Sequence, residues 1–138
     1  MTELLIAAVL LAVGGALGGM ARFFVSGVIA RRLGETFPWG TMAVNVTGAV
    51  AIGVLAALLL TPETRAVTHL PAWAGLVLGF LGSYTTVSSF SLQTLALARN
   101  GEAGRALANV ALSLGLCLAA AAGAWLLTGH LLARAGGA

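Results

Sequence analysis

The amino-acid sequence predicts an all-α membrane protein of four transmembrane helices, with a break in the third helix. Of the 138 residues, 59% are hydrophobic and only 8% are charged, whereas soluble domains carry about 25% charged residues. A bilayer core about 30 Å thick is crossed by about 20 helical residues. The chain therefore has room for four spans and short loops in a single domain, residues 1–138. Glycines and hydroxyl side chains gathered in the third apolar block predict the break.

The first two spans are expected over residues 4–29 and 39–60. The amino terminus carries no basic residues, so we interpret the first apolar block as a membrane helix and not as a removable signal. Gly14 and Gly18 are spaced so that a second helix can approach closely in lipid. Arg22 lies in the second half of the same span.

The third span is expected over residues 72–98, which is longer than the bilayer core requires. Six Ser or Thr residues and one Tyr lie within nine positions directly after Gly79 and Gly82. Ser and Thr hydroxyls can donate to carbonyls of their own helix, but so many hydroxyl groups exceed what that use explains. Broken helices are tolerated at membrane depth only where they are buried in protein or line a cavity. We therefore expect an interruption over residues 82–85, beside a protein-lined path. The fourth span is expected over residues 106–133.

The charge pattern excludes several classes of function. All seven basic residues are arginines scattered near the ends of apolar blocks, as membrane anchors are, so no nucleic-acid partner is expected. A proton-coupled transporter normally needs a carboxylate within the membrane. The four carboxylates instead lie at or outside the expected span ends, at Glu3, Glu35, Glu63 and Glu102. The polar groups left inside are mainly hydrogen-bond donors, which suit an anion.

Several polar residues admit both a structural and a functional interpretation. Arg22 is either an anchor that extends to the membrane surface or a positive charge at a pore mouth that concentrates anions. Asn45 either joins two helices or offers its amide donors to a passing ion. In the fourth span, Asn109, Ser113 and Cys117 recur at four-residue spacing and so share one face. These three side chains either join helices or line a path.

Three segments of the sequence resemble the Fluc (CrcB-like) fluoride channels of microbes. They are residues 14–24, 39–53 and 79–91, which read GGALGGMARFF, WGTMAVNVTGAVAIG and GFLGSYTTVSSFS. The third segment, together with the asparagine of the second, is the specific part. The resemblance implies a passive channel that exports cytoplasmic fluoride across the cell membrane. It also implies a dual-topology homodimer, with two chains inserted antiparallel in lipid and two pores at their interface.

The resemblance further implies roles for individual residues. A structural sodium ion at the dimer centre is implied to bind the backbone carbonyls of Gly82 and Thr85. The implied vestibule residue is Arg22, and the implied fluoride-pore residues are Asn45, Thr86, Val87, Ser89, Phe90, Asn109, Ser113 and Cys117. Three residues depart from the family pattern: Val87 replaces a phenylalanine, Gln93 an acidic residue, and Cys117 a common hydroxyl.

Four alternatives remain open. The chain could be one subunit of an obligate heterodimer of two related chains, because Val87 departs from the pore pattern. A small drug/proton antiporter also has four spans, but it needs a carboxylate within the first span, and Glu3 is too close to the terminus. An intramembrane serine protease needs a serine paired with a histidine, and neither His69 nor His130 lies in mid-span. A non-transporting assembly subunit would leave the hydroxyl cluster without a purpose.

Overall fold

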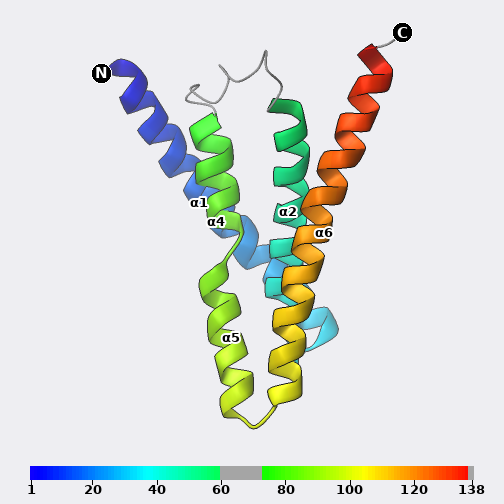
Figure 1. Ribbon diagram of the computed structural model, residues 1–138. Helices are drawn as coiled ribbons and strands as arrows, with labels where there is room; N and C mark the ends of the chain where they lie inside the picture. Colours follow the sequence, from blue (N-terminus) through cyan, green and yellow to red (C-terminus); the bar gives the residue numbers. More distant parts are fainter. Residues whose placement is uncertain (60–72, 137–138) are drawn as a thin grey trace.

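The computed structural model describes residues 1–59 and 73–136, and in these ranges the regular structure is entirely helical (Figure 1). Four stretches are long and apolar enough to cross a membrane, which confirms the predicted number of spans within the described residues. The third stretch is divided into three parts. The elements are α1 (Thr2–Leu33), α2 (Trp39–Leu59), the π-helical η2 (Ala74–Leu81), α4 (Gly82–Tyr84), α5 (Val87–Arg99) and α6 (Ala103–Gly136).

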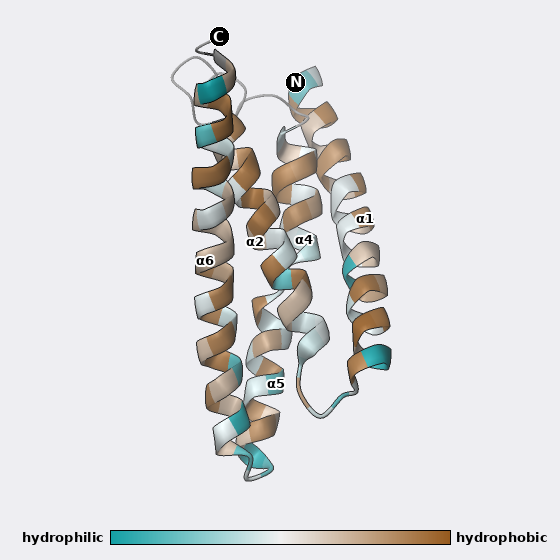
Figure 2. Ribbon diagram, turned by 90° about the vertical axis from the view of Figure 1, so that its right-hand side faces the viewer, coloured by the Kyte–Doolittle hydropathy of each residue, from teal (hydrophilic) through white to brown (hydrophobic). Residues whose placement is uncertain are grey.

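Apolar residues recur along the helices, as the brown colour along α1 and α6 in Figure 2 shows, and many of their side chains are exposed. Leu17 on α1 is 53% exposed, and Leu107 and Leu118 on α6 are each 70% exposed. A soluble monomer rarely exposes an apolar surface of this extent. In a bilayer these side chains face lipid tails of similar polarity, so their exposure is expected of a membrane protein.

Close helix packing uses the glycines of α1. A Cβ on Gly14 would collide with the carbonyl oxygen of Gly75 on η2, and one on Gly18 would collide with that of Phe80. The predicted use of Gly14 and Gly18 as a contact between close helices is therefore confirmed, and the partner helix is η2. The second main contact runs along α2 and α6, and α5 packs on the first half of α6. The start of α1 and the end of α6 lie at one end of the bundle, and the α5–α6 turn lies at the other (Figure 1).

The third span is interrupted as predicted, but the predicted position needs correction. Gly82 keeps helical angles (φ −63°, ψ −30°), and the helix continues through Tyr84. Extended backbone occurs at Thr85 (φ −84°, ψ 160°) and Thr86 (φ −153°, ψ 120°). The break therefore covers Thr85 and Thr86, where side-chain partners described below replace the helical hydrogen bonds.

Other helix ends also differ from prediction. The first and fourth helices are longer than expected, and α1 continues to Leu33 through Arg31 and Arg32. Basic side chains in the last turn interact favourably with the helix dipole, which supports this extension. The expected polar loop after the second span, including His69, lies outside the described residues.

Candidate functional site

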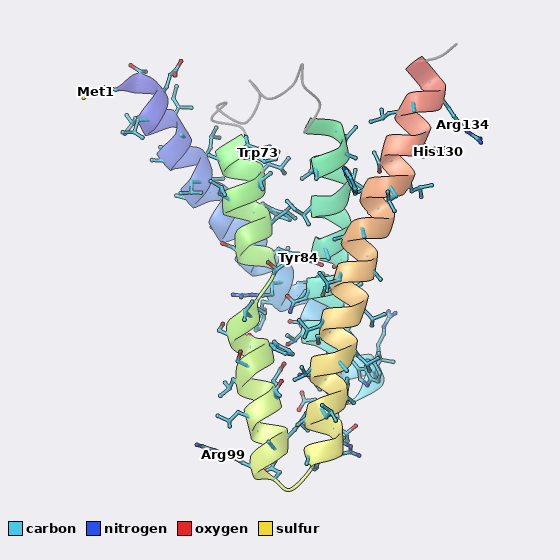
Figure 3. The ribbon with its side chains drawn as sticks, viewed as in Figure 1. Met1, Trp73, Tyr84, Arg99, His130 and Arg134 are labelled. Atoms are coloured by element: carbon cyan, nitrogen blue, oxygen red, sulfur yellow. The ribbon has the colours of Figure 1, made fainter. Side chains whose placement is uncertain are left out.

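The third span is interrupted near its middle by two residues with extended backbone. Tyr84, labelled in Figure 3, ends the helical part before the break, and Thr85 and Thr86 follow it. Extended residues cannot continue the ladder in which each N–H donates to the carbonyl four residues earlier. The backbone groups next to the break therefore need other partners.

Asn45 on α2 forms two hydrogen bonds with the backbone of Thr86, one as donor and one as acceptor. Its Nδ2 donates to the carbonyl oxygen of Thr86 at 2.9 Å, and its Oδ1 accepts from the backbone N–H of Thr86 at 2.7 Å. In an unbroken helix this N–H would donate to the carbonyl of Gly82. The N–H of Thr86 therefore donates to the carboxamide of Asn45 and not to the carbonyl oxygen of Gly82. The predicted role of Asn45 in fluoride conduction stays a prediction.

The side chain of Thr86 caps the helix that begins after the break. Its Oγ1 accepts from the backbone N–H of Ser89 at 3.2 Å, which is the usual arrangement at a helix amino terminus. The same oxygen lies 3.1 Å and 3.2 Å from the hydroxyl oxygens of Ser88 and Ser89. In a continuous helix the N–H of Ser89 would donate to the carbonyl of Thr85. The cap therefore removes the regular donor from a second carbonyl.

The carbonyl oxygens of Gly82 and Thr85 are among those that lose their helical donors at the break. Both residues line a cavity of about 300 Å³, together with Asn45 and Gly48 of α2. A Cβ on Gly48 would collide with Cγ2 of Thr85, so this glycine lets α2 lie close to the break. Backbone oxygens without a donor are suitable ligands for a hard cation. The residues that the resemblance assigns to sodium therefore fit such an ion chemically.

A second cavity, of about 260 Å³, lies next to Thr86 and is rich in polar side chains. It brings together three of the predicted site residues, Arg22, Thr86 and Ser89, with two hydroxyl residues that were not predicted as site residues, Ser26 and Thr41. Ser26 lies four residues after Arg22 and Thr41 lies four residues before Asn45. Because residues four apart share one helix face, this spacing was a signal that could have identified both.

The polar cavity continues toward the end of the bundle. A larger cavity of about 480 Å³ shares the lining residues Phe23, Ser26, Thr41 and Ser89 with it. The larger cavity also reaches Glu35, in the loop after α1. Two adjoining cavities that share the hydroxyl residues Ser26, Thr41 and Ser89 therefore lie between α1, α2 and α5 of one chain, from the α1–α2 loop to Thr86, and we call them together the polar passage.

Gln93 on α5, one of the departures from the family pattern, lines this larger cavity. Its Oε1 is buried and has no hydrogen-bond partner among the described residues.

The polar face predicted on the fourth span is partly occupied by contacts between helices. Asn109 is 1% exposed, and its Nδ2 donates to Oγ1 of Thr94 on α5 at 2.8 Å. Thr94 in turn donates to the carbonyl oxygen of Phe90 at 2.7 Å. The hydroxyl of Ser113 donates to Oδ1 of Asn109 at 3.4 Å. These contacts favour the helix-joining interpretation for Asn109 and Ser113. Thr94 was not predicted as a site residue.

The remaining predicted pore residues lie apart from the polar passage. Val87 is 76% exposed on α5, and Phe90, one turn later, is half-buried. Cys117 is half-buried on α6. Neither Val87 nor Cys117 is among the lining residues of the three cavities described above. Within this chain the two residues are therefore not brought together with Thr86 and Arg22.

Comparison with known proteins assigns the chain to a family. A family model described as CrcB-like protein, Camphor Resistance (CrcB), matches residues 9–125. The chain belongs to the CrcB family. This confirms the family that the three quoted segments predicted. The matched range extends from α1 into α6 and contains every residue of the candidate site.

Curated relatives of this CrcB protein are similar over most of its length. A protein of Bradyrhizobium diazoefficiens named "Fluoride-specific ion channel FluC 2" is 63% identical over 115 residues, which are 83% of each chain. A protein of the same name from Rhodopseudomonas palustris is 57% identical over 88% of this chain and 92% of its own. A "Fluoride-specific ion channel FluC" of Opitutus terrae is 50% identical over 89% of both chains.

These names are those of ion channels and not of enzymes, so the protease alternative is not supported for this CrcB protein. With its four apolar helices, the chain is a multi-pass membrane protein.

Proposed function

We propose that this CrcB protein is a fluoride-selective passive channel that exports cytoplasmic fluoride across the cell membrane. The observation that carries the proposal is the polar passage to Thr86, whose inner part is lined by Arg22 and by hydroxyl residues. Fluoride is strongly hydrated, and a pore must replace its water with hydrogen-bond donors. Hydroxyl donors do this without a fixed charge that would trap the ion. The relatives named as fluoride-specific channels support the identity of the ion.

The amino terminus of α5 adds to this preference for anions. This 13-residue helix begins at Val87, beside the break and near the middle of the third apolar stretch. The amino end of a helix carries partial positive charge and unpaired N–H groups, which attract anions. Arg22, which lines the same cavity as Thr86, raises the local concentration of anions further.

We expect a second, antiparallel copy of the chain to complete the path. The half-buried ring of Phe90 would then present its partially positive edge to the ion. The arginines are compatible with insertion in both directions. Arg31, Arg32, Arg99 and Arg105 lie in helix ends next to the turns that follow the first and third spans. Arg134 lies in the last turn of α6, and Arg65 falls between the second and third spans in the sequence. Four arginines against two is a weak asymmetry, whereas a clear excess of Arg and Lys on one side normally sets the orientation of a membrane protein.

We also expect a structural sodium ion where two such copies cross. The carbonyls of Gly82 and Thr85 from each chain would hold it, because neither keeps its helical donor. Four neutral oxygens suit a monovalent cation. When bound, the ion would satisfy backbone oxygens that are otherwise costly in a membrane. Its charge would also raise the local potential for anions.

Fluoride efflux from liposomes that contain this chain alone tests the proposal. We expect fluoride efflux far above that of protein-free liposomes, and chloride efflux close to that of the protein-free control. Equal fluxes of the two ions would refute selectivity for fluoride. Uptake that requires a pH gradient would instead indicate proton-coupled transport.

A heterodimer is the second candidate, and the exposed Val87 in place of a phenylalanine favours it. In that case a folded single chain would give no flux, and flux would return when a related chain is co-reconstituted.

A further inference from the structure

We propose that Glu35 and Arg31 set the rate at which fluoride enters the polar passage, as two opposed charges at its mouth, which is the part of the larger cavity next to the α1–α2 loop. Arg31 raises the local concentration of anions there, and Glu35 lowers it. The inference rests on the proposed function, because it concerns the rate of fluoride entry. The two charges themselves can be tested on the protein without any ion flux.

The end of α1 places Glu35 at the mouth. α1 ends at Leu33, and Gly34 follows with a φ of 83°, a left-handed angle that glycine adopts without strain. After this turn Glu35 lines the larger cavity together with Phe37 and Pro38. Among the described residues that line this cavity, Glu35 is the one that carries a charge. An anion that enters from the loop therefore passes a carboxylate first.

The positive charge of Arg31 lies close to the same cavity. A Cβ on Gly27 would lie 3.2 Å from Nη1 of Arg31, so the guanidinium lies against Gly27. Gly27 is one of the lining residues of the larger cavity, and Arg31 is not. The guanidinium is therefore beside the path and acts on a passing ion through its field.

The two charges act on an ion separately. Within the described residues the ion pair joins Arg105 to Glu102, and neither Arg31 nor Glu35 takes part in one. Opposite charges in a tight pair largely cancel at a distance, whereas separated charges each contribute to the potential. Removal of either charge should therefore change the rate of anion entry, and the two removals should act in opposite directions.

The size of the effect follows from the exposure of both residues. Glu35 and Arg31 are exposed, so their fields reach an ion largely through water. A unit charge about 8 Å from a monovalent ion in water changes the local concentration of that ion about twofold. The Debye length is about 30 Å at 0.01 M salt and about 3 Å at 1 M, so the effect should be lost in high salt.

Fluoride efflux from liposomes in about 0.01 M and about 1 M potassium glutamate tests the inference. In low salt we expect Glu35→Gln to raise efflux about twofold, Arg31→Gln to lower it about twofold, and the double variant to conduct like the unmodified chain. In high salt all four chains should conduct at one rate. Efflux in low salt that Glu35→Gln leaves unchanged or lowers would overturn the inference. So would differences that persist in high salt, because the loss of a structural contact is not screened.

Glu102→Gln is the matched control. It changes the net charge of the chain by the same amount as Glu35→Gln, but Glu102 pairs with Arg105 at 2.7 Å and lines neither cavity of the passage. We expect its efflux to equal that of the unmodified chain at both salt concentrations. A twofold rise in this control as well would mean that net charge, and not the position of Glu35, sets the rate, and would overturn the inference.

The potential at the mouth can be measured without flux. Ala30 lines the larger cavity, so Ala30→Cys in a chain with Cys117→Ala places a single thiol there. Its rates of reaction with a cationic and an anionic methanethiosulfonate reagent are compared in low salt. We expect Glu35→Gln to slow the cationic reagent and speed the anionic one about twofold each, so that their rate ratio falls about fourfold. Arg31→Gln should raise the ratio by the same factor.

A rate ratio that Glu35→Gln leaves unchanged would overturn the inference. A chain that conducts no fluoride, but whose rate ratio shifts with both variants as expected, would instead refute the proposed function and leave the two opposed charges at the mouth in place.

Discussion

Replacing Asn109 by leucine tests whether this buried side chain joins helices or lines the ion path. Asn109 is 1% exposed on α6, donates to Thr94 at 2.8 Å and accepts from Ser113 at 3.4 Å. Leucine has a similar volume, so the change removes hydrogen bonds without opening a large cavity. The effect on stability should therefore report mainly on the hydrogen bonds.

The expected magnitude follows from the two bonds. The 2.8 Å bond joins side chains of two helices, and such bonds in membranes contribute about 0.6 kcal/mol on average and at most about 1.7 kcal/mol. The bond at 3.4 Å is long and contributes little. Thr94 keeps its own bond to Phe90, so its hydroxyl is not left without a partner. We expect the free energy of unfolding to fall by about 1 kcal/mol, and fluoride efflux to fall less than about tenfold.

The assay is a double-mutant cycle with Asn109→Leu, Thr94→Val and the double variant. Unfolding in mixed detergent micelles is followed by tryptophan fluorescence at one protein concentration, because association would otherwise change the apparent stability. A coupling energy of about 0.6 to 1.7 kcal/mol is expected. Coupling near zero would refute the helix-joining role. Loss of all fluoride efflux at unchanged stability would show that Asn109 lines the path.

Three further substitutions have clear expectations, each measured by fluoride efflux from liposomes beside the control Gly104→Ala, whose new Cβ would meet open space. Gly48→Val should abolish efflux, because the side chain collides with Thr85 at the break; unchanged efflux would mean that α2 need not lie so close. Phe90→Ala should lower efflux with association unchanged on gel filtration, since it removes a ring expected to face the ion, and normal efflux would place the path elsewhere. Gly82→Val should abolish efflux although, beyond its own neighbours in the helix, the nearest atom to a Cβ there is the carbonyl oxygen of Val77 at 3.8 Å, so a fully active variant would contradict the crossing of two copies at this glycine.

Much of this protein's architecture could be predicted from the sequence alone. Apolar blocks of membrane length require helices, because a bilayer leaves no other way to satisfy the backbone groups of a single chain segment. The spacing of Gly14 and Gly18 identified a close helix contact, since small residues are what allow backbones to approach in lipid. The hydroxyl cluster after Gly82 indicated a broken span, because a continuous helix has no need of it.

The exact place of the break depended on the tertiary structure. Glycine at position 82 suggested an interruption there, yet Gly82 is helical and the break lies at Thr85 and Thr86. Local sequence cannot settle this, because the competing acceptor for the N–H of Thr86 is on another helix, 41 residues away at Asn45. The break lies where the N–H of Thr86 donates to the side chain of Asn45 instead of to the carbonyl of Gly82.

The grouping of the polar residues was likewise decided by packing. Hydroxyl and amide residues at four-residue spacing form one face of a helix, but the spacing does not say what that face contacts. The fold directs Asn109 to Thr94 and leaves Arg22, Thr41 and Ser89 around one cavity. All of these side chains carry polar groups that need hydrogen-bond partners inside a membrane. Only the positions of the neighbouring helices determine whether a protein partner or an open cavity is beside each one.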